Sequence, residues 1–166
     1  GVVWKAVQPA LDVRGRVVEQ VPLTAGDPVE AVGLAGQVGV VVADPGVVDL
    51  VANKALVWSS DDRDAQWEVM DVTPDLADKL GITVPSDRAI LAAAPKYRTE
   101  LVDTCLEMDD VAMEAYLEGK EPSEDTLKAC LRKGTLTGAF NPVLCGSSYK
   151  NKGVQQVLDA VVDYLP

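Results

Sequence analysis

The stretch VEAVGLAGQVGVVVADPGVVDLVANKALVW, residues 29–58, decides the fold class of this chain. Its β-branched runs are interrupted by Gly33, Gly36 and Gly39 and by the Ala-Asp-Pro-Gly sequence at 43–46. Short β-branched runs separated by glycine and proline are typical of strands joined by tight turns. The stretch therefore predicts several short, consecutive strands.

The strand pattern continues beyond this stretch. The polar segment WSSDDRDA (58–65) is typical of a hairpin connection, and AQWEVMDV (65–72) alternates apolar and polar residues as a further strand does. We therefore expect an antiparallel sheet between about residues 28 and 73.

Helical signals follow the predicted sheet. TPDLADKLG has Thr73 as a candidate N-cap, Pro74 at the first helical position and Gly81 as a stop, which predicts a short helix. From Pro85 onward the composition favours helix. The order of elements is that of a mixed α/β protein.

The central helices are less clearly delimited by the sequence. Residues 92–106 are periodic, and Pro95 either begins the main helix or kinks it. Residues 109–119 continue or restart that helix up to Gly119. SEDTLKACLRKG (123–134) has a serine N-cap, acids in its first turn, bases in its last turn and a terminal glycine, all of which predict one helix.

The C-terminal segment predicts one more strand and one more helix. FNPVLCG (140–146) is strand-like, and a helix follows a second glycine. Five apolar residues of that helix fall at helical spacing and predict one stripe that packs on a sheet: Val154, Val157, Leu158, Val161 and Leu165. We expect an α/β fold with an antiparallel sheet flanked by helices.

Composition excludes several functions. The chain has 166 residues, a formal net charge of −11 and no histidine, so phosphate-backbone binding is disfavoured and histidine general-base chemistry is absent. Three widely spaced cysteines (Cys105, Cys130 and Cys145) predict reduced thiols of a cytosolic protein and no structural zinc. No apolar run approaches the roughly 20 residues of a membrane span, and the first residues lack a signal-peptide pattern.

Acidic residues dominate one region of the predicted helices. Residues 100–125 contain ten acids and one base, Lys120. Five of the acids step by 3, 4, 3 and 4 and would form one negative stripe on a single helix: Glu100, Asp103, Glu107, Asp110 and Glu114. Two interpretations stand at this point, a solvated face or a docking surface for a basic partner.

Nucleotide motifs are missing, although one loop has the composition of a ligand loop. A phosphate-binding loop needs Gly, four residues and Gly-Lys-Ser/Thr, and no such sequence occurs. No Gly-x-Ser-x-Gly sequence occurs either. Cys145-Gly146-Ser147-Ser148 places small residues after the predicted strand, as a plain turn or as backbone amides offered to a ligand.

Two segments, YRTELVDTCLEMDDVAMEAYLEGKEPSEDTLKACLRKGTL (97–136) and PVLCGSSYKNKGVQQVLDAVVDYLP (142–166), resemble translation elongation factor G, the translocation GTPase. GVVDLVANKALVW (46–58) is similar to the strand pair that precedes them in that family. The resemblance covers about two-thirds of the chain, whereas residues 1–45 match poorly.

The resemblance implies a domain organisation. Residues 1–45 would be a divergent, strand-rich segment, and residues 46–136 would be the subdomain that the family inserts into its GTPase domain. Residues 137–166 would supply the last strand, guanine loop and helix of the GTPase domain, a remnant of its sheet edge.

The same resemblance implies two sets of site residues. Cys145, Gly146, Ser147 and Ser148 would contact a guanine base, with Ser148 in place of the family's usual alanine, and only Asp12 corresponds to the family's Asn-Lys-x-Asp motif. The acids at 100, 103, 107, 110 and 114 would contact the C-terminal domain of the ribosomal stalk protein.

The resemblance also bears on catalysis. The intact family uses GTP and Mg²⁺, but this chain lacks the loops that hold them, and phosphoryl transfer depends on positioning phosphates and metal. We therefore expect no cofactor and no GTP hydrolysis by this chain alone. Two alternatives are a recombined or engineered scaffold without activity, and one chain of a GTPase that a partner chain completes.

Overall fold

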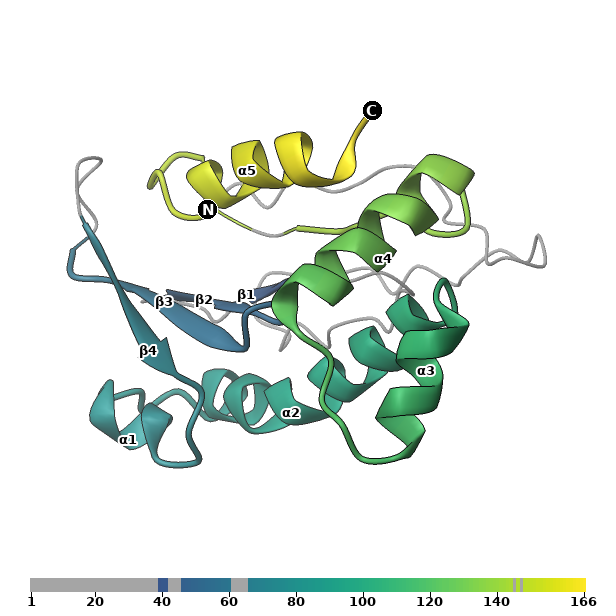
Figure 1. Cartoon of the computed structure of the whole chain (residues 1–166). Helices are drawn as coiled ribbons and strands as arrows, with labels where there is room; N and C mark the ends of the chain where they lie inside the picture. The colour runs from purple at the N-terminus through teal and green to yellow at the C-terminus, as the bar shows by residue number, and fades with distance from the viewer. Residues whose placement is uncertain (1–38, 42–45, 61–65, 145, 147) are drawn as a thin grey trace.

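The computed structural model describes residues 39–41, 46–60, 66–144, 146 and 148–166 (Figure 1). The predicted strands within residues 1–38 lie outside the described residues. No helix in the described part is long and apolar enough to cross a membrane.

Four strands form one antiparallel sheet in the order β1-β2-β3-β4, so that strands adjacent in sequence are also adjacent in the sheet. The strands are β1 (Gly39–Val41), β2 (Gly46–Asp49), β3 (Lys54–Trp58) and β4 (Trp67–Asp71). In the turn between β2 and β3, Asp49 Oδ1 accepts hydrogen bonds from Val51 N at 2.8 Å and Ala52 N at 3.0 Å. The antiparallel sheet predicted from the sequence is confirmed for this part of the chain.

The two faces of the sheet have different apolar partners. Val48 and Ala55 belong to the main core, which helices cover. On the opposite face, Trp58 forms a smaller cluster with Val47 and Leu56, and its ring lies 5.8 Å from that of Trp67. Alternation of side chains along each strand produces this division.

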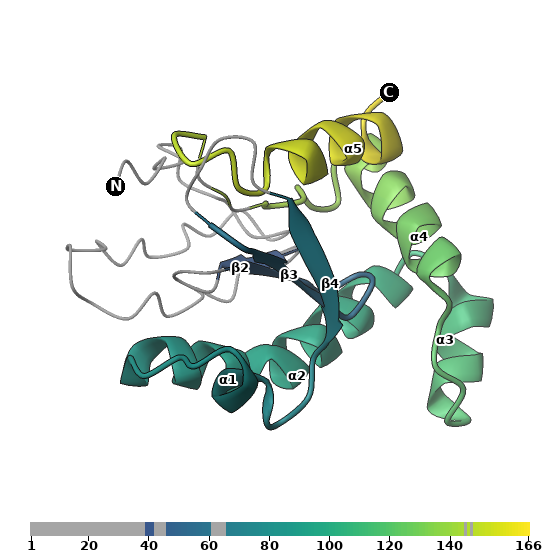
Figure 2. The ribbon, with the colours of Figure 1, turned by 90° about the vertical axis from the view of Figure 1, so that its left-hand side faces the viewer.

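Helices α1 (Leu76–Lys79) and α2 (Pro85–Leu106) lie on one side of the sheet, and α5 (Val154–Tyr164) lies on the other (Figures 1 and 2). The prediction of Thr73 as the N-cap of the first helix is wrong, because a turn intervenes and Asp75 precedes the helix. Helix α2 begins at Pro85, where a missing N–H costs nothing, and Pro95 lies inside it.

A break separates α2 from α3 (Asp110–Leu117), so the sequence restarts a helix instead of continuing one. The cause is Asp109, whose side chain accepts hydrogen bonds from Val111 N and Ala112 N, both at 3.1 Å, and so begins a new helix. Arg98 ties α2 to the sheet, because its guanidinium donates to the carbonyl oxygens of Leu50 and Val51.

Ser123 is the N-cap of helix α4 (Glu124–Thr137), as predicted, and its Oγ accepts a hydrogen bond from Thr126 N at 3.1 Å. The predicted end at Gly134 is wrong, because the helix continues to Thr137 and closes at Gly138 in the left-handed conformation, φ 72°. Gly134 has a packing role instead: a Cβ there would lie 2.2 Å from the ring of Phe140.

The prediction of a strand over residues 140–146 is also wrong for its described residues, of which only Val143 makes an isolated bridge. Helix α5 (Val154–Tyr164) follows Gly153, whose φ is 78°. It joins the main core through Ala160 and Tyr164.

The apolar stripe of α5 does not pack as predicted. Helix α5 packs on α4, where Arg132 donates to the carbonyl oxygens of Val162 and Asp163. Because the contact uses the face of Ala160 and Tyr164, the predicted stripe lies largely outside it. Val154 is half-buried, and the other members of the stripe are exposed: Val157, Leu158, Val161 and Leu165.

Candidate functional site

The first three acids of the predicted stripe lie on one exposed face at the end of α2, where Glu107 directly follows the last residue of the helix. Glu100, Asp103 and Glu107 are all exposed and follow one another at intervals of three and four residues, which places them on one side of a helix. Glu100 lies 3.8 Å from Lys96 Nζ in an exposed ion pair of little energetic weight. Their exposure fits both the solvated face and the docking surface considered from the sequence.

The other two acids, Asp110 and Glu114, lie on α3 beyond the break. Both are exposed. The prediction of one helix carrying all five acids is therefore wrong, because Asp109 caps a new helix. Helix α4 also contacts the segment between α2 and α3, since Lys133 Nζ donates a hydrogen bond to the carbonyl oxygen of Met108.

An acid of α2 and a tyrosine of α3 interact electrostatically. Burial raises the pKa of the Tyr116 hydroxyl, and the nearby carboxylates of Asp103 and Glu121 raise it further. The charge of Asp103 in α2 is thus felt by Tyr116 in α3. Among the residues that the structure describes, no cation pairs with Asp103, Glu107, Asp110 or Glu114.

The predicted guanine loop is described only in part. Asp12, Cys145 and Ser147 lie outside the described residues. Gly146 approaches the chain after the loop so closely that a Cβ would meet Lys152 O at 2.6 Å. Ser148 is exposed in a turn, where its carbonyl oxygen accepts from Asn151 N at 3.3 Å.

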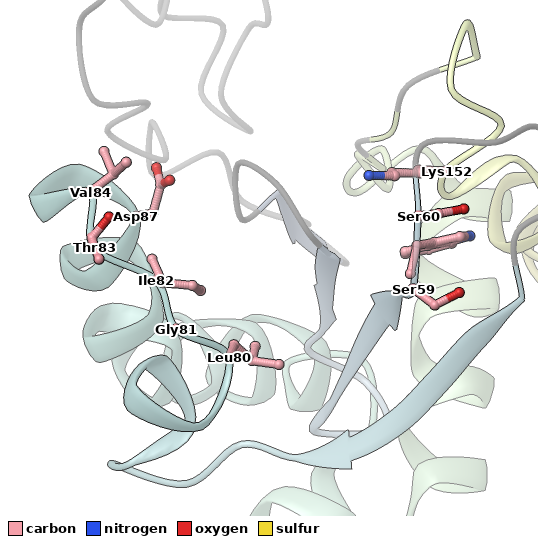
Figure 3. Close-up of a pocket in the computed structure, with 10 residues that line it drawn as sticks. Ser59, Ser60, Leu80, Gly81, Ile82, Thr83, Val84, Asp87 and Lys152 are labelled. Carbon is pink, nitrogen blue, oxygen red and sulfur yellow. The ribbon is translucent and has the colours of Figure 1, made fainter.

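A cavity of about 410 Å³ lies between the end of β3 and the connection from α1 to α2 (Figure 3). Two oppositely charged side chains line it, Asp87 and Lys152, each only 7 % exposed and each engaged in an interaction. The apolar lining includes Trp58 and Ile82. The sequence gives no signal of this cavity, since its walls come from segments far apart in the chain.

No group of three or more cysteine, aspartate or glutamate side chains in the described ranges could hold a metal ion. No family model matches the chain. The fold and its surface define a mixed α/β protein that exposes acidic groups on two successive helices.

Proposed function

We propose that this chain is a part or derivative of an elongation factor G-type translocation factor, and that the acids of α2 and α3 bind the C-terminal domain of the ribosomal stalk protein. The resemblance of residues 97–136 and 142–166 supplies the family and the partner. The observation that carries the proposal is the exposure of Asp103, Glu107 and Asp110 without a paired cation in the described part.

Physical chemistry favours a basic partner for these helices. Like charges three and four residues apart destabilise a helix by a few tenths of a kcal/mol per pair, and a cation from a partner removes that repulsion. Exposed charges mainly accelerate encounter, and their attraction weakens once salt shortens the screening length to about 8 Å at physiological ionic strength.

The proposed role does not require nucleotide chemistry in this chain. GTP and Mg²⁺ belong to the intact family, whereas the sequence here has no phosphate-binding loop. A cytoplasmic location follows from the proposal, because translation factors act on cytoplasmic ribosomes.

The test is a triple charge reversal, Asp103→Lys, Glu107→Lys and Asp110→Lys, in the full chain. We expect it to abolish binding of the stalk protein's C-terminal domain at low salt, measured by calorimetry. The fold should persist, because exposed substitutions usually change stability by less than about 0.5 kcal/mol each.

A matched control separates a specific surface from net charge. Glu68→Lys, Asp125→Lys and Asp159→Lys change the net charge equally at exposed positions elsewhere. This control variant should bind like the parent chain. Equal binding by the parent and the α2–α3 variant at low salt would reduce the acids to a solvated face.

A further inference from the structure

The outer face of α3 combines acids with the two most exposed aliphatic side chains of the described part. Val111 is 78 % exposed and Leu117 is 79 % exposed. With 100° per residue, they lie on opposite flanks of Glu114, and Asp110 and Glu118 fall within the same arc of roughly 120°. The face is therefore mixed in character, with an acid between two aliphatic groups.

Helix α3 contributes little to the core, since none of its residues is fully buried. It contacts α2, and Ala112, Met113 and Tyr116 pack against the main core from its inner side. In Figure 2, α3 forms an edge of the molecule, with no labelled helix or strand on its outer side. Single exposed aliphatic residues are common on protein surfaces, but here two of them border one carboxylate on a short peripheral helix.

We propose that this face of α3 docks a basic amphipathic helix, whose cations meet Asp110, Glu114 and Glu118 and whose aliphatic side chains cover Val111 and Leu117. The proposal rests on the proposed function and adds an apolar contact to it. Charge complementarity selects the occupant, because a helix without cations would leave Asp110 and Glu114 desolvated and unpaired. Glu118 already lies 3.6 Å from Lys120 Nζ in an exposed ion pair. Amphipathic helices commonly bind a partner through aliphatic anchors on their apolar face.

The two kinds of contact respond differently to salt. Attraction between exposed charges is screened, whereas burial of aliphatic surface is not weakened by salt. An apolar contact at Val111 and Leu117 would therefore maintain part of the affinity at an ionic strength that removes the contribution of the acids.

The experiment measures binding of the stalk protein's C-terminal domain to the full chain at about 50 mM and about 300 mM salt. Val111→Ser with Leu117→Ser should lower the affinity about tenfold at both salt concentrations, which is about 1.4 kcal/mol. The salt dependence should be unchanged. Helix α5 offers a matched pair, Leu158→Ser with Val162→Ser, exposed by 61 % and 76 %, which should bind like the parent.

The outcomes separate this inference from the proposed function. If the α3 double variant binds as tightly as the parent while charge reversal abolishes binding, the apolar contact is wrong and the proposed function stands. If the parent binds nothing, the proposed function fails.

A lysine-rich amphipathic peptide, compared with its variant in which serine replaces every leucine, then tests the face directly. Equal affinity of the two peptides, or none, overturns the inference. Thermal unfolding of each variant verifies that the fold is intact.

Discussion

Gly134 shows how a single missing side chain allows a tight contact. The helix α4 backbone faces the ring of Phe140, and Gly138 in the left-handed conformation turns the chain back over the helix. Ala139 N donates to Gly134 O at 2.9 Å and secures this return. Helical propensity favours alanine over glycine by about 1 kcal/mol, so space for the ring explains the glycine better than backbone conformation does.

We predict that Gly134→Ala destabilises the protein by about 1–3 kcal/mol, because the new methyl group would overlap the Phe140 ring. Urea unfolding measures the change. Gly134→Ala should cost less in a Phe140→Leu background than in the parent chain, because the smaller side chain leaves room for the new methyl group. A stabilising effect of Gly134→Ala in the parent chain would contradict the packing described here.

The buried thiols predict a loss of stability at alkaline pH. Burial raises the pKa of the Cys105 thiol to about 12, with a smaller contribution from Cys130. Burial likewise raises the pKa of Tyr164 to about 12. The folded protein therefore retains protons that the unfolded chain releases, since ordinary thiols titrate near 8.5.

The contribution of Cys105 to the free energy of unfolding should accordingly be constant below about pH 8. It should decrease as the pH rises towards 12. The expected slope is about 1.4 kcal/mol per pH unit for each such group. Urea unfolding at pH 8, 9 and 10 should give a shallower slope for Cys105→Ala than for the parent. Identical slopes would mean that Cys105 titrates alike in both states.

At the scale of elements, Asp109 decides where α2 and α3 separate. Its side chain satisfies two N–H groups that the new helix leaves without carbonyl partners. Asp109→Ala should cost about 1 kcal/mol of unfolding free energy, measured by urea denaturation. The neighbouring Asp110→Ala, which removes an exposed acid that is not a cap, should change it by less than about 0.5 kcal/mol.

Much of the order of strands and helices could be predicted from the sequence, because turn residues and helix caps act through interactions with residues close to them in the chain. Glycine and β-branched residues predicted the sheet, and Ser123 marked the start of α4. The sequence left open whether the helix continues or restarts at Asp109, because a charge spacing of three and four residues does not reveal a cap that interrupts the helix. The exposed acids could thus be predicted from the sequence, but their division between two helices could not.

Two features, the packed face of α5 and the cavity, depend on tertiary packing and could not be predicted from local sequence patterns. The periodicity of α5 predicted a helix, but the face that packs is that of Ala160 and Tyr164, because α4 supplies its partner. A repeat of apolar residues identifies an apolar stripe and does not identify which face meets a neighbour. Likewise, the cavity near Asp87 and Lys152 depends on segments that only the fold brings together.

At the scale of the whole molecule, the chain should not bind guanine nucleotide tightly. The sequence lacks the phosphate-binding loop and the magnesium motif, and contacts to a base cannot replace those to phosphate and Mg²⁺. A calorimetric titration of the full chain with GTP and Mg²⁺ should show no binding at micromolar concentration. A clear micromolar isotherm would instead favour a complete nucleotide site.

The strand order of the sheet has a consequence for how quickly it assembles. Each strand of the described part pairs with its neighbour in the chain, and β2 and β3 are joined by a short turn that Asp49 stabilises. Closing a short loop loses little chain entropy, and hairpins form within about 1–10 microseconds. Pairing between β2 and β3 can therefore precede the docking of α2, whose Arg98 binds the carbonyl oxygens of that same turn. A preformed hairpin would then serve as the template on which the helices condense.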